Sequence, residues 1–515
     1  MSSIAPPIST TEALVELRAV SAELYDLSKI GELLGWDQET MMPSKGVSWR
    51  ASQIATLSGI HHEKLTAHRV GELVKRLKDD AADTRRQLRD VDRGLIREMT
   101  RGYERSVKLP LRLVKELAQA TSESVAVWQK ARAESNWSGF RASLSNVIGL
   151  KRQVAEHVGY TFEPYDAMLD EYEPGATGRQ LQPMFDTLRA ETVTLLGKIN
   201  RLGKSTDRSI LERDFPVDLQ WKFGETVLGW MGFDFEAGRQ DKSTHPFCSS
   251  FAPTDVRITT RLNANDLGQA LFGSMHEGGH ALYEQGIGEA VFRSAIGGGV
   301  SLGVHESQSR MWENFVGRSR SFWEYALPHL KKVFPDQLGD IDVETFWRAI
   351  NQVRPTFIRV ESDEVTYNLH IALRFDLERR LFAGTLSVDD LPAAWNASMN
   401  DMLGITPETD RIGVLQDIHW GFGLVGYFPT YTLGNLYGAQ IWSAIGRDVP
   451  DRDSRIAAGD LRPILDWTRE RIHQHGGTYL PGDLIERATG EAPNATYLGK
   501  YLNEKFAAVY GFSAE

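Results

Sequence analysis

Residues 274–282 contain two histidines and a glutamate in the order His276-Glu277-x-x-His280. On an α-helix, residues four apart lie on the same face, so His276 and His280 would present two imidazoles one turn apart. Neutral imidazoles in this arrangement chelate a divalent metal ion, and Zn²⁺ favours such nitrogen donors. Glu277 would project about 100° away from His276, which suits a base acting on a water molecule rather than a third ligand. The spacing therefore predicts the metal helix of a zinc peptidase.

A catalytic zinc site also needs a third protein ligand and one open position for water. Glu306 is the best candidate, because it follows His280 by 26 residues (306 − 280 = 26) and lies beyond a glycine-rich loop, at the start of another predicted helix. His305 and Gln308 flank it and are of the types that orient a metal ligand. The alternative is that Glu306 is a solvated surface charge. We predict that Glu306 completes the site.

The elements that must position these residues are almost all helical. Apolar spacings of three and four predict helices over 10–35, 138–157, 177–201, 208–230, 266–285, 342–352, 360–382, 388–402, 428–446, 459–475 and 494–509, one opening near 304, and mostly helix over 61–133. Residues 165–175 are expected to form an acidic connector that ends in a turn. Residues 245–248 and 255–260 predict two short strands just before the metal helix. A peptide substrate could add itself to the edge of such a ribbon.

Glycines mark the metal helix and the loop after it. Gly278 is expected to allow close packing of another element, and Gly279 either packing or room for a substrate. Gly299-x-Ser301-x-Gly303 matches the nucleophile elbow of serine hydrolases. We reject that interpretation, because the elbow belongs between a strand and a helix of an α/β sheet, and no βαβ alternation surrounds this segment.

Composition narrows the class of protein. A chain of 515 residues predicts two helical lobes, interleaved in sequence, with residues 1–235 covering a cleft and residues 236–515 carrying the metal site. The net charge of −11 argues against sequence-independent nucleic-acid binding. No apolar stretch is long enough to span a membrane, and no secretory signal is recognisable. The single cysteine, Cys248, excludes an intrachain disulfide and is not expected to be a nucleophile. We expect a cytoplasmic protein.

Several short motifs along the chain resemble those of the thermostable carboxypeptidase (carboxypeptidase Taq) family of metallocarboxypeptidases. They are, in order, Trp36-Asp37-x-Glu39-Thr40, Tyr165-Asp166-x-x-Leu169-Asp170, His245-Pro246-Phe247, Asp255-x-Arg257-x-Thr259, His276-Glu277-x-x-His280, His305-Glu306-Ser307-Gln308, Ile358-Arg359-x-x-Ser362-Asp363 and Gly413-x-x-Gln416-Asp417-x-His419-Trp420. The likeness covers nearly the whole chain. Ser362 departs from the alanine that is commoner in the family.

This resemblance implies a mainly α fold, a two-lobed saddle with a deep active-site cleft and a small β ribbon beside the metal helix. It also implies bound Zn²⁺, with Co²⁺ as a possible substitute, and a homodimer. The activity implied is removal of single residues from peptides with a free C-terminus, with broad preference and with terminal proline resisted.

Catalysis needs a base and donors for the oxyanion. Glu277 would take a proton from water and deliver it to the leaving amine. His419, Tyr427 and Tyr431 are the candidates for the donors that stabilise the tetrahedral oxyanion. These residues could instead be a capping histidine and tyrosines of the core.

An exopeptidase must also bind the free carboxylate of its substrate. Arg359 is the first candidate and Arg257 the second, because a guanidinium holds a carboxylate with two parallel hydrogen bonds. Either arginine could instead pair with the aspartate of its own motif, Asp363 or Asp255. Asp363 and Asp417 could also orient the ligand imidazoles. His245 and Gln416, from the first and last motifs of the second half, are expected to contact the substrate.

Two rival interpretations remain open. The first is a zinc endopeptidase or dipeptidase on a related cleft, which would not read the terminal carboxylate in the same way. The second is a non-catalytic helical peptide-binding protein with a vestigial metal site. Glu277 argues against the second, because metal binding alone has no use for it.

Overall fold

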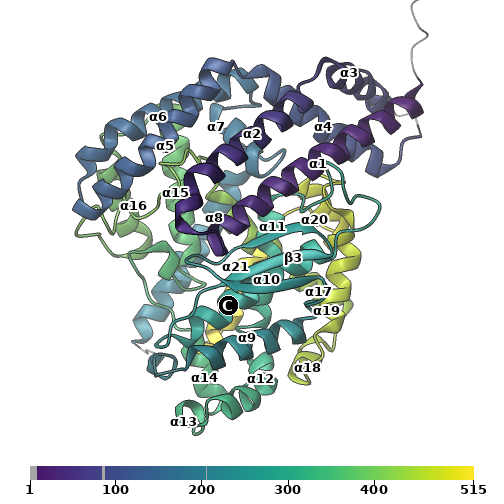
Figure 1. The fold of residues 1–515 in the computed structure, drawn as a ribbon. Coiled ribbons are helices and arrows are strands. Elements are labelled where there is room, and N and C mark those ends of the chain that lie inside the picture. The colour runs from purple at the N-terminus through teal and green to yellow at the C-terminus, as the bar shows by residue number, and fades with distance from the viewer. Residues whose placement is uncertain (1–8, 84–86, 204–205, 515) are drawn as a thin grey trace, which may run out of the picture.

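The computed structural model describes residues 9–83, 87–203 and 206–514, and these form a mainly helical molecule around one small sheet (Figure 1). The predicted mainly α fold with a β ribbon beside the metal helix is confirmed. Residues 1–8, part of the segment without a recognisable secretory signal, lie outside the described residues. The division into two lobes near residue 235 stays a prediction.

The helices before the sheet are α1 (Thr10–Thr40), α2 (Val47–Leu65), α3 (His68–Ala82), α4 (Asp90–Lys108), α5 (Leu111–Glu134), α6 (Trp137–Val158), α7 (Pro164–Tyr172), α8 (Gly178–Leu202) and α9 (Val217–Met231). The strands are β1 (Gly238–Lys242), β2 (Cys248–Ala252) and β3 (Asp255–Thr260). The helices after them are α10 (Leu267–Gln285), α11 (Leu302–Arg310), the π-helix Met311–Val316, α12 (Arg320–Val333), α13 (Pro335–Leu338), α14 (Val343–Ile350), α15 (Tyr367–Ala383), α16 (Leu391–Leu403), α17 (Pro429–Asp448), α18 (Arg452–Ala457), α19 (Arg462–Arg471), α20 (Pro481–Thr489) and α21 (Thr496–Tyr510). Short 3₁₀ segments cover Ser44–Gly46, Ser209–Leu211, Arg359–Glu361 and His473–His475.

Three predicted elements were wrong in detail. The expected acidic connector is largely helix α7, which begins at Pro164 and is capped reciprocally by Glu163 and Asp166. The single helix predicted over 208–230 is instead a 3₁₀ turn at Ser209–Leu211 and helix α9, because Pro216, the N-cap of α9, disfavours helical geometry at the residue before it. The helix predicted from residue 360 begins only at Tyr367.

The sheet has the strand order β1-β3-β2, with β1 parallel and β2 antiparallel to β3. An antiparallel pair is present, in which Cys248 of β2 pairs with Ile258 of β3, and the strand predicted over 255–260 is confirmed. The strand predicted over 245–248 was placed too early, because β2 begins only at Cys248. β1 was missed, because its sequence is polar and lacks apolar alternation. Side chains on β3 alternate, with Val256 and Ile258 fully buried and Arg257 on the other face, 4.4 Å from the ring centroid of Trp36 in α1.

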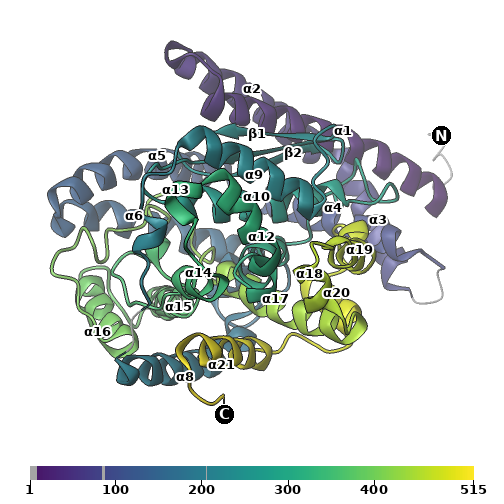
Figure 2. The same cartoon turned by 90° about the horizontal axis from the view of Figure 1, so that it is seen from below.

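The sheet therefore forms a layer between α1 and α10, as the two views of the fold show (Figures 1 and 2). On the α10 side, Ser274 and Thr260 join the helix to β3 by a hydrogen bond of 3.3 Å between their hydroxyls. Cys248 at the start of β2 lies close enough to Glu277 for that carboxylate to add to the effect of burial in raising the pKa of the thiol. The ribbon consequently borders the metal helix.

Glycines let α10 approach its neighbours. A Cβ at Gly278 would lie 2.5 Å from Leu228 Cδ2 in α9, and a Cβ at Gly279 would lie 2.6 Å from the carbonyl oxygen of Gln308 in α11. Both glycines thus serve packing, and Gly279 brings α10 against the helix that carries Glu306. Ser301 is the N-cap of α11 and its hydroxyl accepts the Val304 N–H, so the segment is a helix cap after a loop and not a nucleophile elbow.

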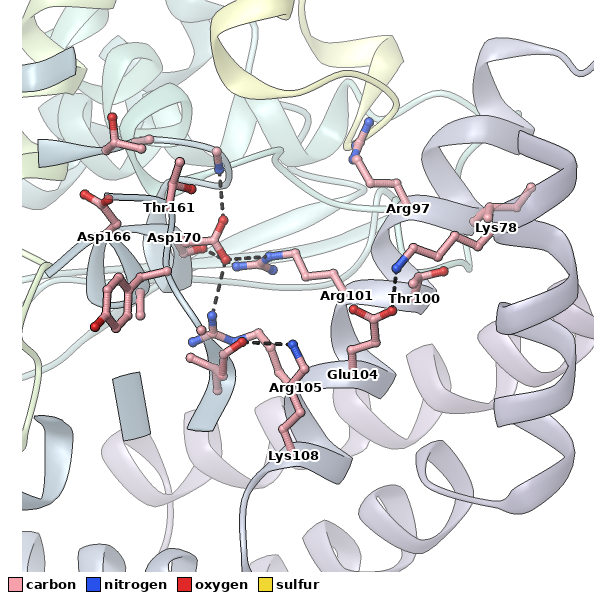
Figure 3. A pocket seen from close by; sticks show the side chains of 18 of the residues that line it. Lys78, Arg97, Thr100, Arg101, Glu104, Arg105, Lys108, Thr161, Asp166 and Asp170 are labelled. Carbon is pink, nitrogen blue, oxygen red and sulfur yellow. Dashed lines mark hydrogen bonds and ion pairs between the residues drawn. The ribbon is translucent and has the colours of Figure 1, made fainter. Parts of the chain in front are cut away.

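A ladder of arginines fixes α4 to the rest of the molecule (Figure 3). Arg97, Arg101 and Arg105 stand four residues apart on α4 and line a cavity of about 630 Å³. Arg97 donates to backbone carbonyls, including Gly477 O at 2.6 Å, and Arg101 and Arg105 each donate to Asp170 Oδ2 at 3.2 Å. These cations are used in holding α4 to α7 and to the turn before α20.

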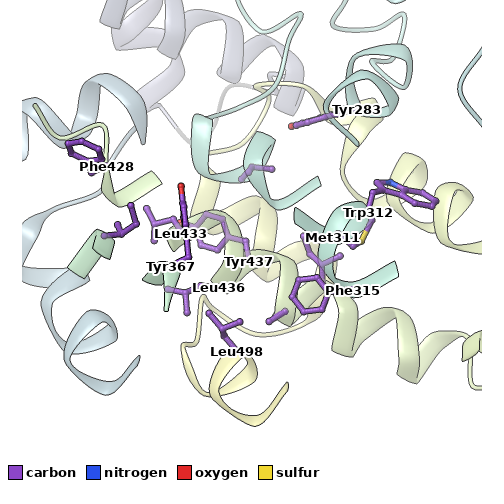
Figure 4. Packing of buried hydrophobic residues seen from close by; sticks show 14 of the residues in the cluster. Tyr283, Met311, Trp312, Phe315, Tyr367, Phe428, Leu433, Leu436, Tyr437 and Leu498 are labelled. Carbon is purple, nitrogen blue, oxygen red and sulfur yellow. The ribbon is translucent and has the colours of Figure 1, made fainter. Parts of the chain in front are cut away.

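The core that supports the second half of the chain is built on α17 (Figure 4). Leu433, Leu436 and Tyr437 of α17 are buried against the π-helix residue Phe315 and against Leu498 of α21. Among the residues that the structure describes, no helix has the length and apolar character needed to cross a membrane.

Candidate metal centre and active site

The side chains of His276, His280 and Glu306 converge on one point. His276 Nε2 lies 3.5 Å and His280 Nε2 lies 3.4 Å from Glu306 Oε2. One potential ligand atom from each residue lies within 4.8 Å of the others. α10 supplies the two imidazoles, and α11 supplies the carboxylate across the contact made at Gly279. The predicted triad is thus brought together by the packing of two helices.

Glu313, in the π-helix, orients His276. The two residues bond through His276 Nδ1 and Glu313 Oε2 at 2.9 Å, which leaves His276 Nε2 facing Glu306. Burial opposes the charged form of His276, but Glu306 and Glu313 outweigh it and raise its pKa. Burial also disfavours the charged form of Glu313, but Arg310 and His276 more than offset it and hold its pKa well below the usual range.

His280 is oriented differently, through a second histidine. His305 Nε2 bonds Glu284 Oε1 at 2.9 Å, and His305 Nδ1 lies 2.6 Å from His280 Nδ1. Because Glu284 accepts, His305 Nε2 carries a proton, and the Nδ1 of a neutral His305 then accepts the proton of His280 Nδ1. Burial lowers the pKa of His280 to about 4. His280 is therefore neutral at pH 7, with its bare Nε2 towards Glu306.

Glu306 is held as an anion by its surroundings. Burial disfavours its charge, but Arg310 outweighs this, with the two histidines, and places its pKa well below the usual range. Arg310 Nε donates to Glu306 Oε1 at 2.7 Å, and Ser309 Oγ donates to Oε2 at 3.0 Å. The donor set fits a divalent metal ion, because two imidazole nitrogens and a carboxylate oxygen converge and each imidazole is fixed in the tautomer that ligation needs.

Glu277, on the same turn of α10, lies among charged groups, and none of the described residues bonds its carboxylate. The residue is 6% exposed, and burial raises the pKa of its carboxyl group to about 7. Within residues 9–83, 87–203 and 206–514, none of the hydrogen bonds or ion pairs ends on its carboxylate. A carboxylate in this state can accept a proton near neutral pH and pass it on.

The structure also groups three residues predicted to stabilise an oxyanion. The ring centroids of Tyr427 and Tyr431 lie 5.5 Å apart, and His419 Nε2 lies 3.4 Å from Tyr431 Oη. Burial and then neighbouring groups that include Glu306 raise the pKa of both tyrosines. Burial lowers the pKa of His419 to about 4, so this histidine is neutral at pH 7.

Arg359 belongs to this group and pairs with an aspartate far away in sequence. Its Nε and Nη2 donate to Asp417 at 2.9–3.2 Å, and its Nη1 donates to Tyr367 Oη at 3.0 Å. Arg374 also donates to Asp417, at 2.9 Å from Nε. The guanidinium of Arg310 stacks over Tyr367 at 4.7 Å, so Tyr367 links this cluster to the metal ligands.

Three other predicted residues have different surroundings. Arg257 is paired with Asp255, its own motif neighbour, through two hydrogen bonds of 2.9 and 3.0 Å. Gln416 is buried and accepts the backbone N–H of Arg359 at 2.8 Å. His245 is exposed in the turn before β2.

The suggestion that Asp363 and Asp417 orient the ligand imidazoles is wrong. Asp363 caps its own turn by accepting the N–H groups of Val365 and Thr366, and Asp417 pairs with arginines. The partners of the imidazoles are Glu313 and His305 instead.

Several residues of the site were not predicted from the sequence. They line a cavity beside the metal ligands. A cavity of about 500 Å³ adjoins the metal ligands and is lined by cations and acids that include Arg310, Glu313, Arg318 and the exposed Arg354. Arg310 and Glu313 follow Glu306 by four and seven residues, so a helical repeat from Glu306 was the signal that could have found them.

Comparison with known proteins agrees with this geometry. Residues 16–506 match the family described as carboxypeptidase Taq (M32) metallopeptidase. The chain belongs to this family. Carboxypeptidase Taq relatives include thermostable carboxypeptidase 1 of Thermus thermophilus, 45% identical over 98% of this chain and 100% of the relative, and carboxypeptidase 1 of Bacillus subtilis, 37% identical over 96% and 100%.

Solved structures support the same assignment. The crystal structure of an M32 carboxypeptidase from Deinococcus radiodurans R1 superposes with a TM-score of 0.93 at 38% identity, over 97% of this chain and 100% of that one. As a member of the carboxypeptidase Taq family, the chain is a peptide-bond hydrolase of the metallopeptidase class. The family implies a metal ion, and the His276, His280 and Glu306 group is able to bind one.

Proposed function

We propose that the chain is a zinc-dependent carboxypeptidase that releases single residues from the free C-terminus of peptides, with broad preference for the terminal residue. The observation that carries this proposal is the convergence of His276 Nε2, His280 Nε2 and Glu306 Oε2 beside Glu277, whose carboxylate accepts no hydrogen bond from the described residues. Co²⁺ is the expected substitute for Zn²⁺, since both accept this ligand set. Membership of the carboxypeptidase Taq family supports the reaction class.

The chain's own residues can carry out the proton transfers. Bound Zn²⁺ would supply Lewis acidity, which polarises the scissile carbonyl and acidifies a water molecule. Glu277 takes one proton from the attacking water, whose oxygen bonds to the carbonyl carbon. The C–N bond then breaks as Glu277 returns that proton to the leaving nitrogen. A pKa of about 7 suits both transfers, because the group is then neither too weak a base nor too weak an acid.

His419, Tyr427 and Tyr431 would donate to the oxyanion of the tetrahedral intermediate. All three are neutral at pH 7, and the raised pKa values of the two tyrosines keep their hydroxyls protonated, and so able to donate, at higher pH as well. Neutral donors in a buried site stabilise a developing negative charge without carrying a charge that substrate binding must desolvate.

Arg359 would bind the terminal carboxylate. A guanidinium has five N–H groups, and the bonds to Asp417 and Tyr367 leave one free on each terminal nitrogen. Arg257 is the second proposal, and it would have to exchange Asp255 for substrate. Arg354, an exposed cation of the cavity beside Arg310, is a third cation to test.

Two further predicted contacts complete the proposed substrate site. Gln416 would act through Arg359, whose backbone it holds. His245, which precedes β2, would contact the substrate along the edge of the ribbon.

One assay separates this function from its rivals. A peptide with a free C-terminus and its amidated twin are incubated with the metal-loaded protein, and products are followed by mass spectrometry with the metal content measured in parallel. We expect stepwise loss of single residues from the free peptide and little from the amide. Equal cleavage of both peptides indicates an endopeptidase. A dipeptide serves as a third substrate, and its cleavage alone indicates a dipeptidase, whereas no turnover of any of the three indicates a peptide-binding protein.

We also propose a cytoplasmic homodimer. α2 has no buried residue and exposes Trp49 by 75% and Ile60 by 47%, which lie eleven residues apart and so on one face. Burying these two side chains against a second copy of the chain would remove apolar surface from water, which favours association. Light scattering should give the mass of two chains, and Trp49→Glu should reduce it to one if this face forms the interface.

The single free thiol, Cys248, favours the cytoplasm as the location, because a reducing compartment does not call for disulfides. Cell fractionation tests this location.

A further inference from the structure

A buried glutamate from the first half of the chain touches the helix that carries Glu306. Glu173 follows α7 and is 2% exposed. Its Oε2 accepts the backbone N–H of Gly303 at 3.1 Å, and its Oε1 accepts the hydroxyl of Tyr437 at 3.0 Å. One carboxylate therefore bridges the first turn of α11 and the middle of α17, two elements more than 100 residues away in sequence.

The contact with α11 is close because residue 303 is a glycine. A Cβ there would lie 2.6 Å from Glu173 Oε2 and 3.1 Å from Leu433 Cβ. The first N–H groups of a helix have no partner within the helix and carry a partial positive charge, so a carboxylate is a favourable partner for them. Glu173 thus fixes the start of α11, three residues before Glu306 (306 − 303 = 3).

The contact with α17 lies opposite the metal ligand itself. A Cβ at Gly434 would lie 2.4 Å from Glu306 Cγ, so α17 forms the wall behind the Glu306 side chain. Tyr437 stands three residues further along the same helix and so on a neighbouring part of the same face. Glu173 consequently ties α11, which carries Glu306, to α17, against which the Glu306 side chain packs.

A buried carboxylate is a costly way to obtain stability alone. In the described part of the chain no lysine or arginine forms an ion pair with Glu173, and its partners are neutral N–H and O–H groups that include the Ser301 hydroxyl. Burial of a charge without a counter-ion costs free energy, which the hydrogen bonds offset only in part. This cost is explained if the carboxylate has a task in setting the geometry of α11.

We propose that Glu173 is a positioning residue for Glu306, which holds α11 against α17 at the depth where the Glu306 carboxylate meets both ligand imidazoles. The inference rests on the proposed metal site. It gives the first half of the chain a part in metal affinity, through the residue that follows α7 and the Tyr165–Asp170 motif.

The test is the metal affinity of Glu173→Gln, measured by competition of Zn²⁺ between the purified full chain and a chelator. We expect the dissociation constant to rise by up to about 10-fold, below the range for groups that bond a metal ligand directly, because Glu173 acts on Glu306 through α11. The visible absorption spectrum of the Co²⁺-loaded variant should change, because Glu306 would sit differently on the metal. A second variant, Gly303→Ala, keeps the carboxylate but pushes it away, and should act in the same direction.

Glu378→Gln is the matched control. Glu378 is as buried as Glu173 and is bonded to neutral donors, but its three partners, Tyr165, Trp420 and Gly426, are not on α11 or α17. It should lose stability while keeping the wild-type dissociation constant and Co²⁺ spectrum. The inference is overturned if Glu173→Gln and Gly303→Ala both bind Zn²⁺ within twofold of wild type with the wild-type Co²⁺ spectrum, or if Glu378→Gln weakens binding equally. If the wild type binds Zn²⁺ no better than Glu306→Gln, the metal site itself is wrong.

Discussion

Glu277 of α10 and Glu378 of α15 are two carboxyl groups that burial has brought to the same pKa, about 7. Glu378 has three donors on it, Tyr165 Oη at 2.6 Å, Trp420 Nε1 at 2.7 Å and Gly426 N at 3.0 Å. Glu277 accepts no hydrogen bond from any described residue. The two carboxyl groups are alike in burial and pKa and differ in what surrounds them.

A shifted pKa therefore does not by itself mark a catalytic residue in this protein. The donors around Glu378 join α7, α15 and the 413–428 segment, so its carboxylate is used in holding structure together. Glu277 instead faces other titrating groups, His276 and Glu306, which are the proposed metal ligands. The absence of donors leaves its proton free to move, and that property is what a general base needs.

Glu277→Gln should produce the largest effect. The amide has the same shape but cannot take a proton, so kcat on a free peptide should fall by about 10²- to 10⁴-fold, the usual contribution of a general base. Stopped or continuous assays of the metal-loaded variant measure this. Zn²⁺ content and the far-ultraviolet spectrum serve as controls and should equal those of the wild type. Retention of more than a tenth of the activity would remove Glu277 from the mechanism.

Glu378→Gln should alter how stability depends on pH. In the unfolded chain this carboxyl titrates near 4.5, and in the folded protein burial raises its pKa to about 7. Between these values the folded state binds a proton that the unfolded state has lost, so stability falls as the pH rises through the window. The loss is roughly 3 kcal/mol for this one group, at about 1.4 kcal/mol per pKa unit.

Denaturant unfolding at pH 5 and at pH 7 measures that dependence. In Glu378→Gln the difference between the two pH values should shrink by about 2 kcal/mol, because only part of the titration lies between pH 5 and pH 7. Activity at pH 7 relative to folded protein should change far less than in Glu277→Gln. An unchanged pH dependence of the stability would show that burial does not raise the pKa of Glu378. The comparison of its pKa with that of Glu277 would then fail.

Glu313→Gln and Glu284→Gln should give intermediate effects on the metal. Glu313 bonds His276 directly, whereas Glu284 reaches His280 only through His305. Loss of a direct outer partner should weaken Zn²⁺ binding by about 10- to 100-fold, and loss of the indirect one by less. Chelator competition on both variants tests the order. Equal affinities, or the reverse order, would mean that His305 transmits the orientation of His280 as firmly as a direct bond.

The metal triad could be predicted from sequence because its chemistry is local. The i,i+4 spacing of His276 and His280 fixes their geometry wherever the helix lies, and Glu306 stood out after its glycine-rich loop. The residues that support the triad could not be found in this way. Glu313 and Glu284 are charged residues on helices, and such residues usually face solvent.

Contacts between residues distant in sequence were also not predicted. Arg359 was expected to pair with Asp363 if it did not bind substrate, yet its partner is Asp417, 58 residues further on (417 − 359 = 58). The proposed role of Glu173 could not be predicted from the residues around it, because that role depends on a contact with Gly303, which is distant in sequence. Pairings of this kind form only when helices pack against each other. The spacing of residues within one segment does not predict them.

Asp170→Asn should produce the smallest loss of stability. Its comparison with Glu378→Gln separates the effect of burial from the effect of the number of hydrogen-bond donors. Asp170 accepts hydrogen bonds from Arg101, Arg105 and the Gly175 N–H, so it has as many donors as Glu378, but 32% of its side chain is exposed. Water competes for these bonds, and partly exposed ion pairs contribute about 1 kcal/mol or less. Denaturant unfolding should register a loss of this size, reduced further by about 0.5 M salt, which screens such pairs, with kcat unchanged. A loss as large as that of Glu378→Gln would mean that donors rather than burial set the cost.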